Sequence, residues 1–100
     1  MPSQFERTEL LIGAEGIARL AKARIAVFGI GGVGSYVVEA LVRSGIGALD
    51  LFDNDIICLS NLNRQIIATH KTIGRYKVDA AKERIADINP DAVVKAHRLF

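Results

Sequence analysis

The sequence predicts an α/β fold, namely the N-terminal half of a doubly wound, Rossmann-like parallel sheet. A short apolar segment, residues 24–28, leads directly into a glycine cluster at residues 29–34, and a segment with helical spacing follows. Apolar segments and helical segments then alternate along the rest of the chain. The order strand, helix, strand, helix, strand is typical of parallel sheets with right-handed crossover connections.

The first two predicted elements are a helix and a strand. Residues 14–22 favour a short helix, although Gly13 and Gly16 leave its first residue undefined. Residues 24–28 (RIAVF) are mostly apolar and end at a glycine, which favours a short buried strand.

A helix and a second strand follow the glycine cluster. From Ser35 onwards, apolar side chains recur with the spacing of one helix face. Gly45 ends this helix, because glycine readily adopts the left-handed conformation found there. Residues 48–52 (ALDLF) form the second strand and complete a βαβ unit.

The second half of the chain contains a long connection, a helix and a strand. Residues 53–76 show no sustained periodicity, so short helical turns or a functional loop are expected there. Helical spacing returns at Lys77 and ends at Pro90, and residues 92–100 predict a third strand.

Composition limits the class of protein. The chain has 100 residues, of which half are apolar and 24% are charged, so it fits one globular domain and excludes a disordered chain. No apolar run approaches the roughly 20 residues of a membrane span. The single cysteine, Cys58, cannot form an internal disulfide, which predicts a cytoplasmic protein. Because Cys58 lies among Ile57 and other apolar residues, we expect it to be buried.

The glycine cluster, GIGGVG at residues 29–34, is the first feature that indicates a function. Gly29 permits a tight turn, Gly31 lets the backbone approach a phosphate, and Gly34 allows the helix to pack closely on the strand. The N-terminus of the helix offers free N–H groups to an anion. The alternative is a tight turn without a ligand, but four glycines placed between strand and helix favour nucleotide binding.

Charged residues after the second strand extend this prediction. Asp53 ends that strand, where a carboxylate accepts hydrogen bonds from ribose hydroxyls. Arg64 and Lys77 suit a triphosphate, although either cation alone is also typical of a solvated loop. The glycine cluster and Asp53 fit a nicotinamide-dependent dehydrogenase equally well, but that class gives no reason for Asn61, Arg64 or Lys77.

Together, these motifs resemble those of the ubiquitin-activating-enzyme-like superfamily, of the ThiF, MoeB and HesA type. The resemblance rests on GIGGVG, on DND at residues 53–55, on SNLNRQ at 60–65 and on GRYK at 74–77. It extends to RTELLIG at residues 7–13 and to INP at 88–90. Members use ATP and Mg²⁺ to adenylate a carboxylate and release pyrophosphate, so the resemblance implies an ATP-dependent adenylating enzyme.

The resemblance also implies roles for matching residues. Gly32 is expected to lie on the nucleotide, Asp53 on the ribose, and residues 60–64 with Lys77 on the phosphates. The residues implied to bind ATP are Gly29, Gly31, Gly32, Gly34, Asp53, Asp55, Ser60, Asn61, Leu62, Asn63, Arg64 and Lys77. Arg7, Arg64 and Lys77 are the implied catalytic residues, with Arg7 entering the ATP site of the partner in a homodimer. The family's Mg²⁺-binding aspartate follows a fourth strand, so no metal ligand is expected within these 100 residues.

Within the superfamily, the sequence resembles the tRNA threonylcarbamoyladenosine dehydratases, because Asn63 stands where sulfur-carrier adenylyltransferases usually have glutamine. In that reaction ATP activates the threonylcarbamoyl carboxylate on tRNA, and ring closure expels AMP. The alternative partner is a ubiquitin-like sulfur-carrier protein, whose C-terminus would be adenylated. A non-catalytic nucleotide-binding or dimerisation module is a third possibility.

Residues 1–100 are expected to be the N-terminal part of a single, truncated ATP-binding adenylation domain. In a sheet of strand order 3-2-1-4, the first strand is flanked by a fourth strand that this sequence does not contain. Ile25, Val27 and the backbone of residues 24–28 would then form an exposed apolar edge. Because one wall of the nucleotide site would also be missing, we expect weak nucleotide binding and no adenylation by these residues alone.

Overall fold

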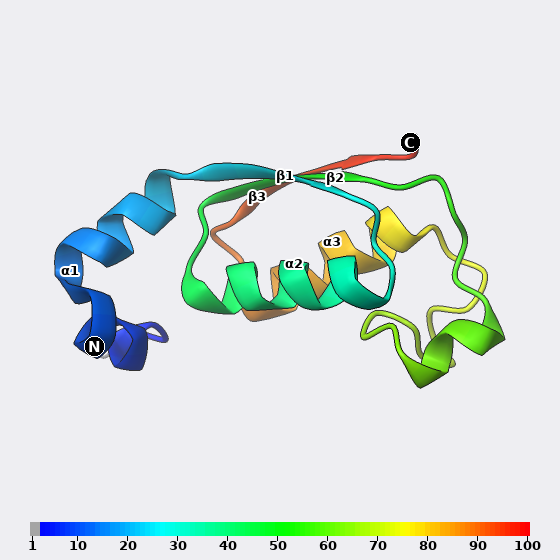
Figure 1. The fold of residues 1–100 in the computed structure, drawn as a ribbon, viewed down its shortest axis with the longest axis horizontal. Coiled ribbons are helices and arrows are strands. Elements are labelled where there is room, and N and C mark those ends of the chain that lie inside the picture. The colour runs from blue at the N-terminus through cyan, green and yellow to red at the C-terminus, as the bar shows by residue number, and fades with distance from the viewer. Residues whose placement is uncertain (1–2) are drawn as a thin grey trace.

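The structure, a computed structural model, describes residues 3–100 as a three-stranded parallel sheet with helices against one face (Figure 1). The strands are β1 (Arg24–Phe28), β2 (Ala48–Phe52) and β3 (Val93–His97), and their order in the sheet is β1-β2-β3. Helices α2 (Gly32–Ser44) and α3 (Lys77–Ile88) connect them in turn. This arrangement confirms the predicted half of a doubly wound sheet.

The hydrophobic core lies between the sheet and the helices α2 and α3. Leu49 and Leu51 of the central strand point toward these helices and expose 1% and 0% of their surface. Val42 of α2 and Val78 of α3 are equally buried. Burying a side chain of this size contributes about 1.5–3 kcal/mol, so the core holds the central strand firmly against α2 and α3.

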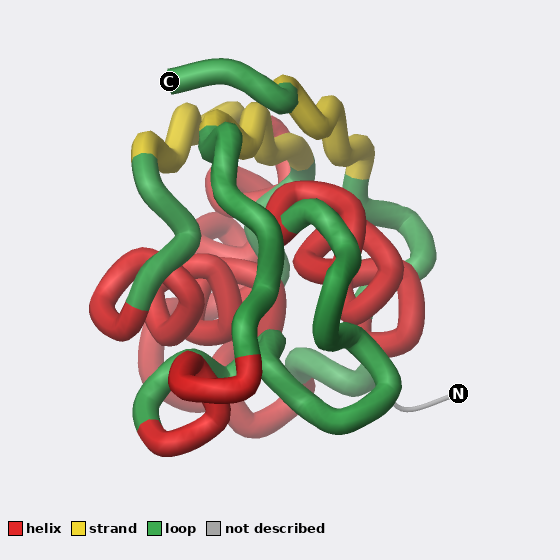
Figure 2. The backbone as a smooth tube through the Cα atoms, turned by 90° about the vertical axis from the view of Figure 1, so that its right-hand side faces the viewer, coloured by secondary structure: helices red, strands yellow, loops and turns green. Residues whose placement is uncertain are grey.

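No helix among residues 3–100 covers the opposite face of the sheet (Figure 2). That face carries a charged cluster of Arg24, Asp50 and His97. Arg24 donates through Nε to Asp50 Oδ2 at 2.6 Å and through Nη2 to Oδ1 at 3.0 Å. His97 Nε2 lies 3.3 Å from Asp50 Oδ1, and its ring stacks on Phe52, which stacks on Phe28. The Arg24 hydrogen bond is the main reason that the pKa of Asp50 is lowered to about 2.

We expect Asp50→Asn to make the stability of the domain less sensitive to acid. The pKa of Asp50 in the folded protein, about 2, is below its ordinary value of 3.8. The ionised carboxylate therefore stabilises the folded state above this ordinary value, and the contribution is lost as the pH falls toward 2. Thermal unfolding across this interval should show a flatter dependence on pH for Asp50→Asn than for the wild type. Asp91→Asn, at an exposed aspartate, should keep the wild-type slope; equal slopes in all three proteins would contradict the role of Asp50.

Helix α1 (Glu6–Lys22) is longer than predicted and lies at the end of the sheet where the strands begin (Figure 1). It starts at Glu6 rather than at residue 14 and bends at Gly13, whose φ is 75°. Glu6 and Glu9 favour this start, because negative side chains in the first turn complement the helix dipole. No α1 residue is buried. Neither α1 nor another helix within residues 3–100 combines the length and apolar character needed to cross a membrane.

The predicted start of α2, the predicted end of β3 and the predicted exposure of the β1 side chains also need correction. Helix α2 starts at Gly32 rather than at Ser35, because the last glycines of the cluster already form its first turn. Strand β3 ends at His97 rather than at residue 100. Among the described strands, β1 pairs with β2 alone, so its outer backbone edge is free as expected. The predicted exposure of its side chains is wrong, since Val27 is buried and Ile25 is half-buried against the core.

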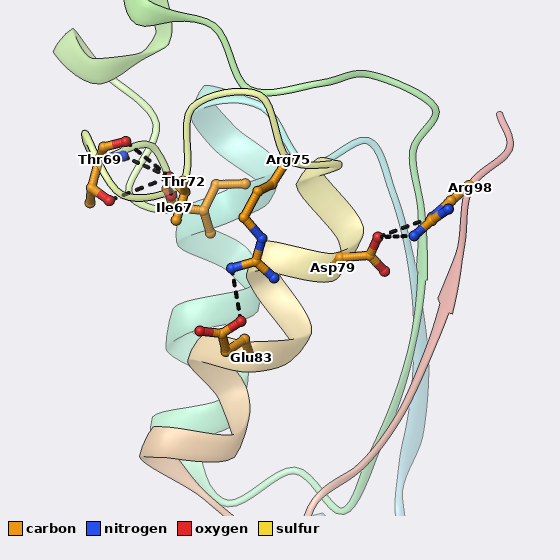
Figure 3. A network of polar contacts seen from close by, with 7 residues as sticks. All are labelled: Ile67, Thr69, Thr72, Arg75, Asp79, Glu83 and Arg98. Carbon is orange, nitrogen blue, oxygen red and sulfur yellow. Dashed lines mark hydrogen bonds and ion pairs between the residues drawn. The ribbon is translucent and has the colours of Figure 1, made fainter.

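The connection between β2 and α3, residues 53–76, is called here the crossover segment. It contains the 3-10 helix η1 (Leu59–Asn63), which agrees with the predicted short helical turns. Arg75 forms an ion pair of 2.8 Å with Glu83 of α3, and the Thr72 hydroxyl bonds to main-chain carbonyls of the same segment (Figure 3). These contacts hold the crossover segment at the end of the sheet that also carries the glycine cluster (Figure 1).

Candidate nucleotide site

The glycine loop, residues 29–34, joins β1 to α2 in a conformation that requires glycine at two positions. Gly29 has a φ of 90°, in the left-handed region that favours glycine. A Cβ atom on Gly34 would lie 1.8 Å from the carbonyl oxygen of Gly29, so only glycine fits there. A Cβ atom on Gly31 would meet nothing closer than 3.9 Å. The structure thus confirms the tight turn and the close helix packing, and it leaves the Gly31 backbone accessible.

Asp53 holds this loop in place from the end of β2. Its Oδ2 accepts a hydrogen bond from the N–H of Ile30, and its Oδ1 accepts one from the N–H of Asp55, both at 2.7 Å. The residue is buried. The sequence predicted a ligand-binding role but missed this structural one. Each carboxylate oxygen can accept a second hydrogen bond, so contact with ribose hydroxyls is compatible with the observed geometry.

Lys77 is the buried cation of the site. It begins α3, its side chain is only 8% exposed, and its Nζ lies 3.8 Å from a carboxylate oxygen of Asp55. Within the described residues, this ion pair is the only polar side-chain contact of Nζ. The aliphatic stem is packed inside the fold, whereas Nζ is not fully buried and Lys77 lines two cavities. An ammonium held at the wall of a cavity attracts an anion that can accept its hydrogen bonds. The surroundings of Lys77 therefore favour an anionic ligand.

Two cavities meet at Lys77. One has a volume of about 230 Å³, and the other about 510 Å³. Both are lined by Asn54, Asp55 and Lys77; the first adds Gly29, Gly31, Asp53 and Phe100, and the second adds Ile56, Cys58 and Asn61. Because they share these three residues, the two cavities adjoin, and they are called the hollow below. The larger one alone lies within the range of about 300–1,000 Å³ that is typical of small-ligand sites. The glycine loop, the end of β2 and the start of α3 all open into the hollow.

Asn61 is the residue of the SNLNR motif that lines this hollow. It is buried, and its Oδ1 accepts a hydrogen bond of 2.8 Å from the N–H of Cys58. The structure does not bring Ser60, Leu62 or Asn63 to either cavity. Asn61 therefore joins Gly29, Gly31, Asp53, Asp55 and Lys77 as a predicted residue that the fold gathers at the site.

Arg64 lies beside the glycine loop but outside the two cavities. Its Nη1 donates to the carbonyl oxygen of Ser60 at 3.1 Å and to Asn63 Oδ1 at 2.9 Å. Its aliphatic stem lies 3.8 Å from the position that a Cβ on Gly32 would occupy. The exposed guanidinium is thus held next to the loop by neutral acceptors of its own turn.

Arg7 does not belong to the same hollow. It is exposed on α1, at the end of the sheet opposite the glycine loop (Figure 1). The molecule is 40 Å long in its longest direction. Arg7 therefore cannot serve the site of its own chain, and its predicted role requires a partner subunit.

Three residues near the hollow were not predicted to be there. Cys58 is exposed and lines the larger cavity, so its predicted burial is wrong; η1 turns it outward while its neighbour Ile57 is buried. Gln65 is buried 3.9 Å from the place of a Cβ on Gly31, and its Oε1 has no hydrogen-bond partner among the described residues. Its position directly after Arg64 in the motif was the available signal. Phe100, which lines the smaller cavity, had no comparable signal.

The glycine loop, Asp53 and Lys77 line one cavity, and the resemblance led us to expect these residues to lie together. Residues 5–100 match the model of the ThiF family. The chain belongs to the ThiF family. It is 50% identical over 100 residues to the tRNA threonylcarbamoyladenosine dehydratase of Bacillus subtilis (strain 168), which covers 100% of this chain and 39% of that protein. It is 36% identical to the adenylyltransferase and sulfurtransferase UBA4 of Candida glabrata, covering 95% of this chain and 23% of that one.

A solved structure of a relative agrees closely with this ThiF-family fold. The crystal structure of Escherichia coli tRNA N6-threonylcarbamoyladenosine dehydratase in complex with ATP superposes with a TM-score of 0.95 at 44% identity. The match covers 97% of this chain and 40% of that chain, and the same E. coli protein has also been solved with AMP. The chain thus spans about two fifths of the length of the dehydratases that it matches.

Proposed function

We propose that this ThiF-family chain binds ATP and forms the nucleotide-binding part of an enzyme that adenylates a carboxylate. The observation that carries the proposal is the position of Lys77, a buried residue that lines a cavity shared with the glycine loop and Asp53. A phosphate beside Lys77 would give that ammonium the acceptors it lacks. The ATP complex of the E. coli dehydratase supports the choice of nucleotide.

The residues of the hollow would divide the work of binding ATP. Asp53, oriented by the N–H groups of Ile30 and Asp55, would accept hydrogen bonds from the ribose hydroxyls. The glycine loop and the N-terminus of α2 would face the phosphates with free N–H groups. Lys77 would neutralise phosphate charge from the other side. Arg64 is exposed, so it can exchange its bonds to Ser60 and Asn63 for phosphate oxygens.

These groups favour adenylation because they stabilise the charge that develops on the phosphates. A carboxylate oxygen of the substrate attacks the α-phosphorus of ATP, and the bond from that phosphorus to the oxygen of pyrophosphate breaks. The products are an acyl-adenylate and pyrophosphate. The carboxylate oxygen, a poor leaving group by itself, then departs as AMP when a nucleophile attacks the acyl carbon.

Mg²⁺ is expected to accompany ATP as a further part of this proposal. Within the described residues, no three His, Cys, Asp or Glu side chains come together to hold a metal ion. Mg²⁺ usually binds through one or two carboxylates together with the phosphates of its nucleotide, so it would be held chiefly by ATP and by the aspartate that the resemblance places after a fourth strand.

We propose that the carboxylate belongs to the threonylcarbamoyl group of a tRNA. The B. subtilis dehydratase is 50% identical to this chain, whereas UBA4 of C. glabrata is 36% identical, which favours tRNA over a ubiquitin-like sulfur carrier. A tRNA substrate also favours a cytoplasmic location. Because the chain spans 39% of the B. subtilis protein, we further propose that residues 1–100 form the N-terminal part of a single adenylation domain.

ATP–pyrophosphate exchange by a purified protein that contains the complete adenylation domain tests this function, because residues 1–100 alone are expected not to adenylate. Exchange should depend on tRNA that carries threonylcarbamoyladenosine, and AMP and cyclised tRNA should accumulate together. If only a ubiquitin-like sulfur carrier stimulates exchange, the substrate is that carrier protein and not tRNA. Binding of NAD more tightly than ATP would overturn the adenylation proposal itself.

We also propose that Arg7 enters the site of a partner subunit in a homodimer. Helix α1 supports this, because it exposes 83% of Leu10 and 88% of Leu11 and lies far from its own chain's hollow. Mixing Arg7→Ala chains with Asp53→Ala chains should restore about a quarter of the wild-type exchange activity. About half of the dimers would be mixed, and each would contain one intact site out of two.

The matched control for this experiment mixes Asp53→Ala with Lys77→Ala. Both changes lie in one chain's own hollow, so every site in a mixed dimer keeps one defect and activity should not return. No rescue in the Arg7 mixture, or equal rescue in both, would show that Arg7 is only a surface cation.

A further inference from the structure

We propose that Lys71 and Arg75 of the crossover segment bind the sugar–phosphate backbone of the substrate tRNA, an inference that rests on the proposed tRNA substrate. Neither residue lines the hollow. Both line a separate cavity of about 320 Å³ between the crossover segment and α3, called here the crossover groove. Glu83 and Asp87 line it from α3.

The positive charge of the chain is concentrated in the crossover segment. Residues 56–78 contain Arg64, Lys71, Arg75 and Lys77 but none of the 11 aspartates and glutamates of the chain. In the rest of the chain, acidic residues outnumber lysines and arginines, so the formal net charge of +2 originates in this segment. Arg64 and Lys77 are assigned to ATP, which leaves Lys71 and Arg75 for a second polyanion. Lysine and arginine bind nucleic-acid phosphates whatever the base sequence.

Lys71 and Arg75 can both donate hydrogen bonds to a phosphate. Lys71 is exposed and forms no ion pair within residues 3–100. Arg75 pairs with Glu83 through Nη1 at 2.8 Å, but its side chain is 39% exposed. A guanidinium has five N–H donors, so the others stay available to an external acceptor.

The carboxylates on the α3 side of the groove are offset by neighbouring arginines. Glu83 is engaged by Arg75, as described above. Asp87 lies near Arg84, because the hydrogen bond to Glu39 and the charge of Asp87 both raise the pKa of Arg84. The charge of Lys71 is therefore not cancelled within the groove.

The turn that carries Lys71 is fixed by hydrogen bonds of its own (Figure 3). The N–H of Thr69 donates to Thr72 Oγ1 at 2.9 Å, and Thr72 Oγ1 donates to the carbonyl of Ile67 at 2.7 Å. Ile67 belongs to the hydrophobic core. His70 and Lys71 are thus held at the surface by a turn anchored in the core, which reduces the entropy lost when RNA binds.

The crossover segment also connects the groove to the hollow, which favours tRNA as the occupant. The segment contributes Cys58 and Asn61 to the larger cavity and ends directly before Lys77. A tRNA carries a phosphate at every nucleotide, so its backbone can contact Lys71 and Arg75 while its modified nucleoside enters the hollow. Contacts of this kind position a nucleic acid without reading its bases.

Lys71→Met should weaken tRNA binding in a way that depends on salt. The variant belongs in a protein that contains the complete adenylation domain. Loss of one phosphate contact lowers the slope of log affinity against log salt by about 0.7–0.9. Between roughly 50 and 200 mM salt, the wild type should therefore lose about threefold more affinity than the variant. ATP affinity without tRNA should not change, because Lys71 does not line the hollow.

Fluorescence anisotropy with labelled tRNA that carries threonylcarbamoyladenosine measures this slope. Lys22→Met is the matched control, since Lys22 is an exposed lysine at the end of α1, where the strands of the sheet begin (Figure 1). Lys71→Arg should keep the wild-type slope, because it preserves the charge. In cyclisation assays, Lys71→Met should raise the KM for tRNA and leave kcat unchanged, as expected for a contact made equally before and during the reaction.

Each result bears on either the groove or the substrate. If the slope falls in Lys71→Met but not in Lys22→Met, the backbone of tRNA lies on the groove. If both variants lower the slope equally, or neither does, the groove is not the docking surface. If Lys71→Met weakens binding of a ubiquitin-like sulfur carrier but not of tRNA, the surface binds protein and the inference is wrong. If the wild type binds ATP but no tRNA, the proposed substrate fails and the inference fails with it.

Discussion

Gly34→Ala is expected to destabilise the domain by about 3 kcal/mol or more, because the change overpacks the main chain. A Cβ at this position would lie 1.8 Å from the carbonyl oxygen of Gly29 and 2.9 Å from its carbonyl carbon. Both atoms belong to the backbone, so no side-chain rotation relieves the overlap. The end of β1 and the start of α2 must move apart, and the core residue Val38 of α2 moves with them.

Urea denaturation followed by circular dichroism measures this loss. Gly32→Ala is the matched control in the same loop, since its Cβ would meet only the Arg64 side chain at an ordinary 3.8 Å. Its unfolding free energy should stay within about 0.5 kcal/mol of the wild type. A Gly34→Ala protein as stable as the wild type would contradict the close packing of α2 on β1.

The parts of the fold that could be predicted are those fixed by local patterns. β1 is followed directly by Gly29, which has a positive φ, and α3 shows an apolar stripe that ends before Pro90. Both elements were therefore predicted at nearly correct bounds. The first half of α1 was missed because Gly13 interrupts its helical pattern. The burial of Val27 was also missed, since it depends on how α2 packs beneath β1 rather than on the neighbours of Val27 in sequence.

The candidate site likewise has features that the sequence predicted and features that it did not. Gly31, Asp53 and Lys77 come together as expected, because parallel strands bring their C-terminal ends to one edge of a sheet. Their roles toward a nucleotide stay predictions until affinities are measured. The outward turn of Cys58 and the approach of Phe100 to Gly29 depend on tertiary contacts, such as the pairing of Arg98 with Asp79. No pattern of neighbouring residues encodes those contacts.

Lys77→Met is expected to have opposite effects on ligand affinity and on stability. Loss of a charged hydrogen bond costs about 1.5–3 kcal/mol, so ATP affinity should fall roughly 10- to 150-fold. AMP should lose less, because Lys77 is assigned to the phosphates beyond the first. Methionine keeps most of the buried aliphatic stem while removing an ammonium whose nearest carboxylate oxygen is 3.8 Å away. The free energy of unfolding should therefore stay equal to that of the wild type or increase.

Calorimetry with ATP and AMP, combined with urea denaturation, separates these two effects. Lys71→Met, at an exposed lysine of the crossover segment, should change neither quantity. Wild-type ATP affinity in Lys77→Met would remove Lys77 from the phosphate site. A clear loss of stability in Lys77→Met would instead make Lys77 a structural partner of Asp55, although the side chain of Asp55 is 70% exposed. Only a ligand-binding role predicts weaker ATP binding in a protein that is no less stable, because a cation that acts only on the ligand does not contribute to the free energy of folding.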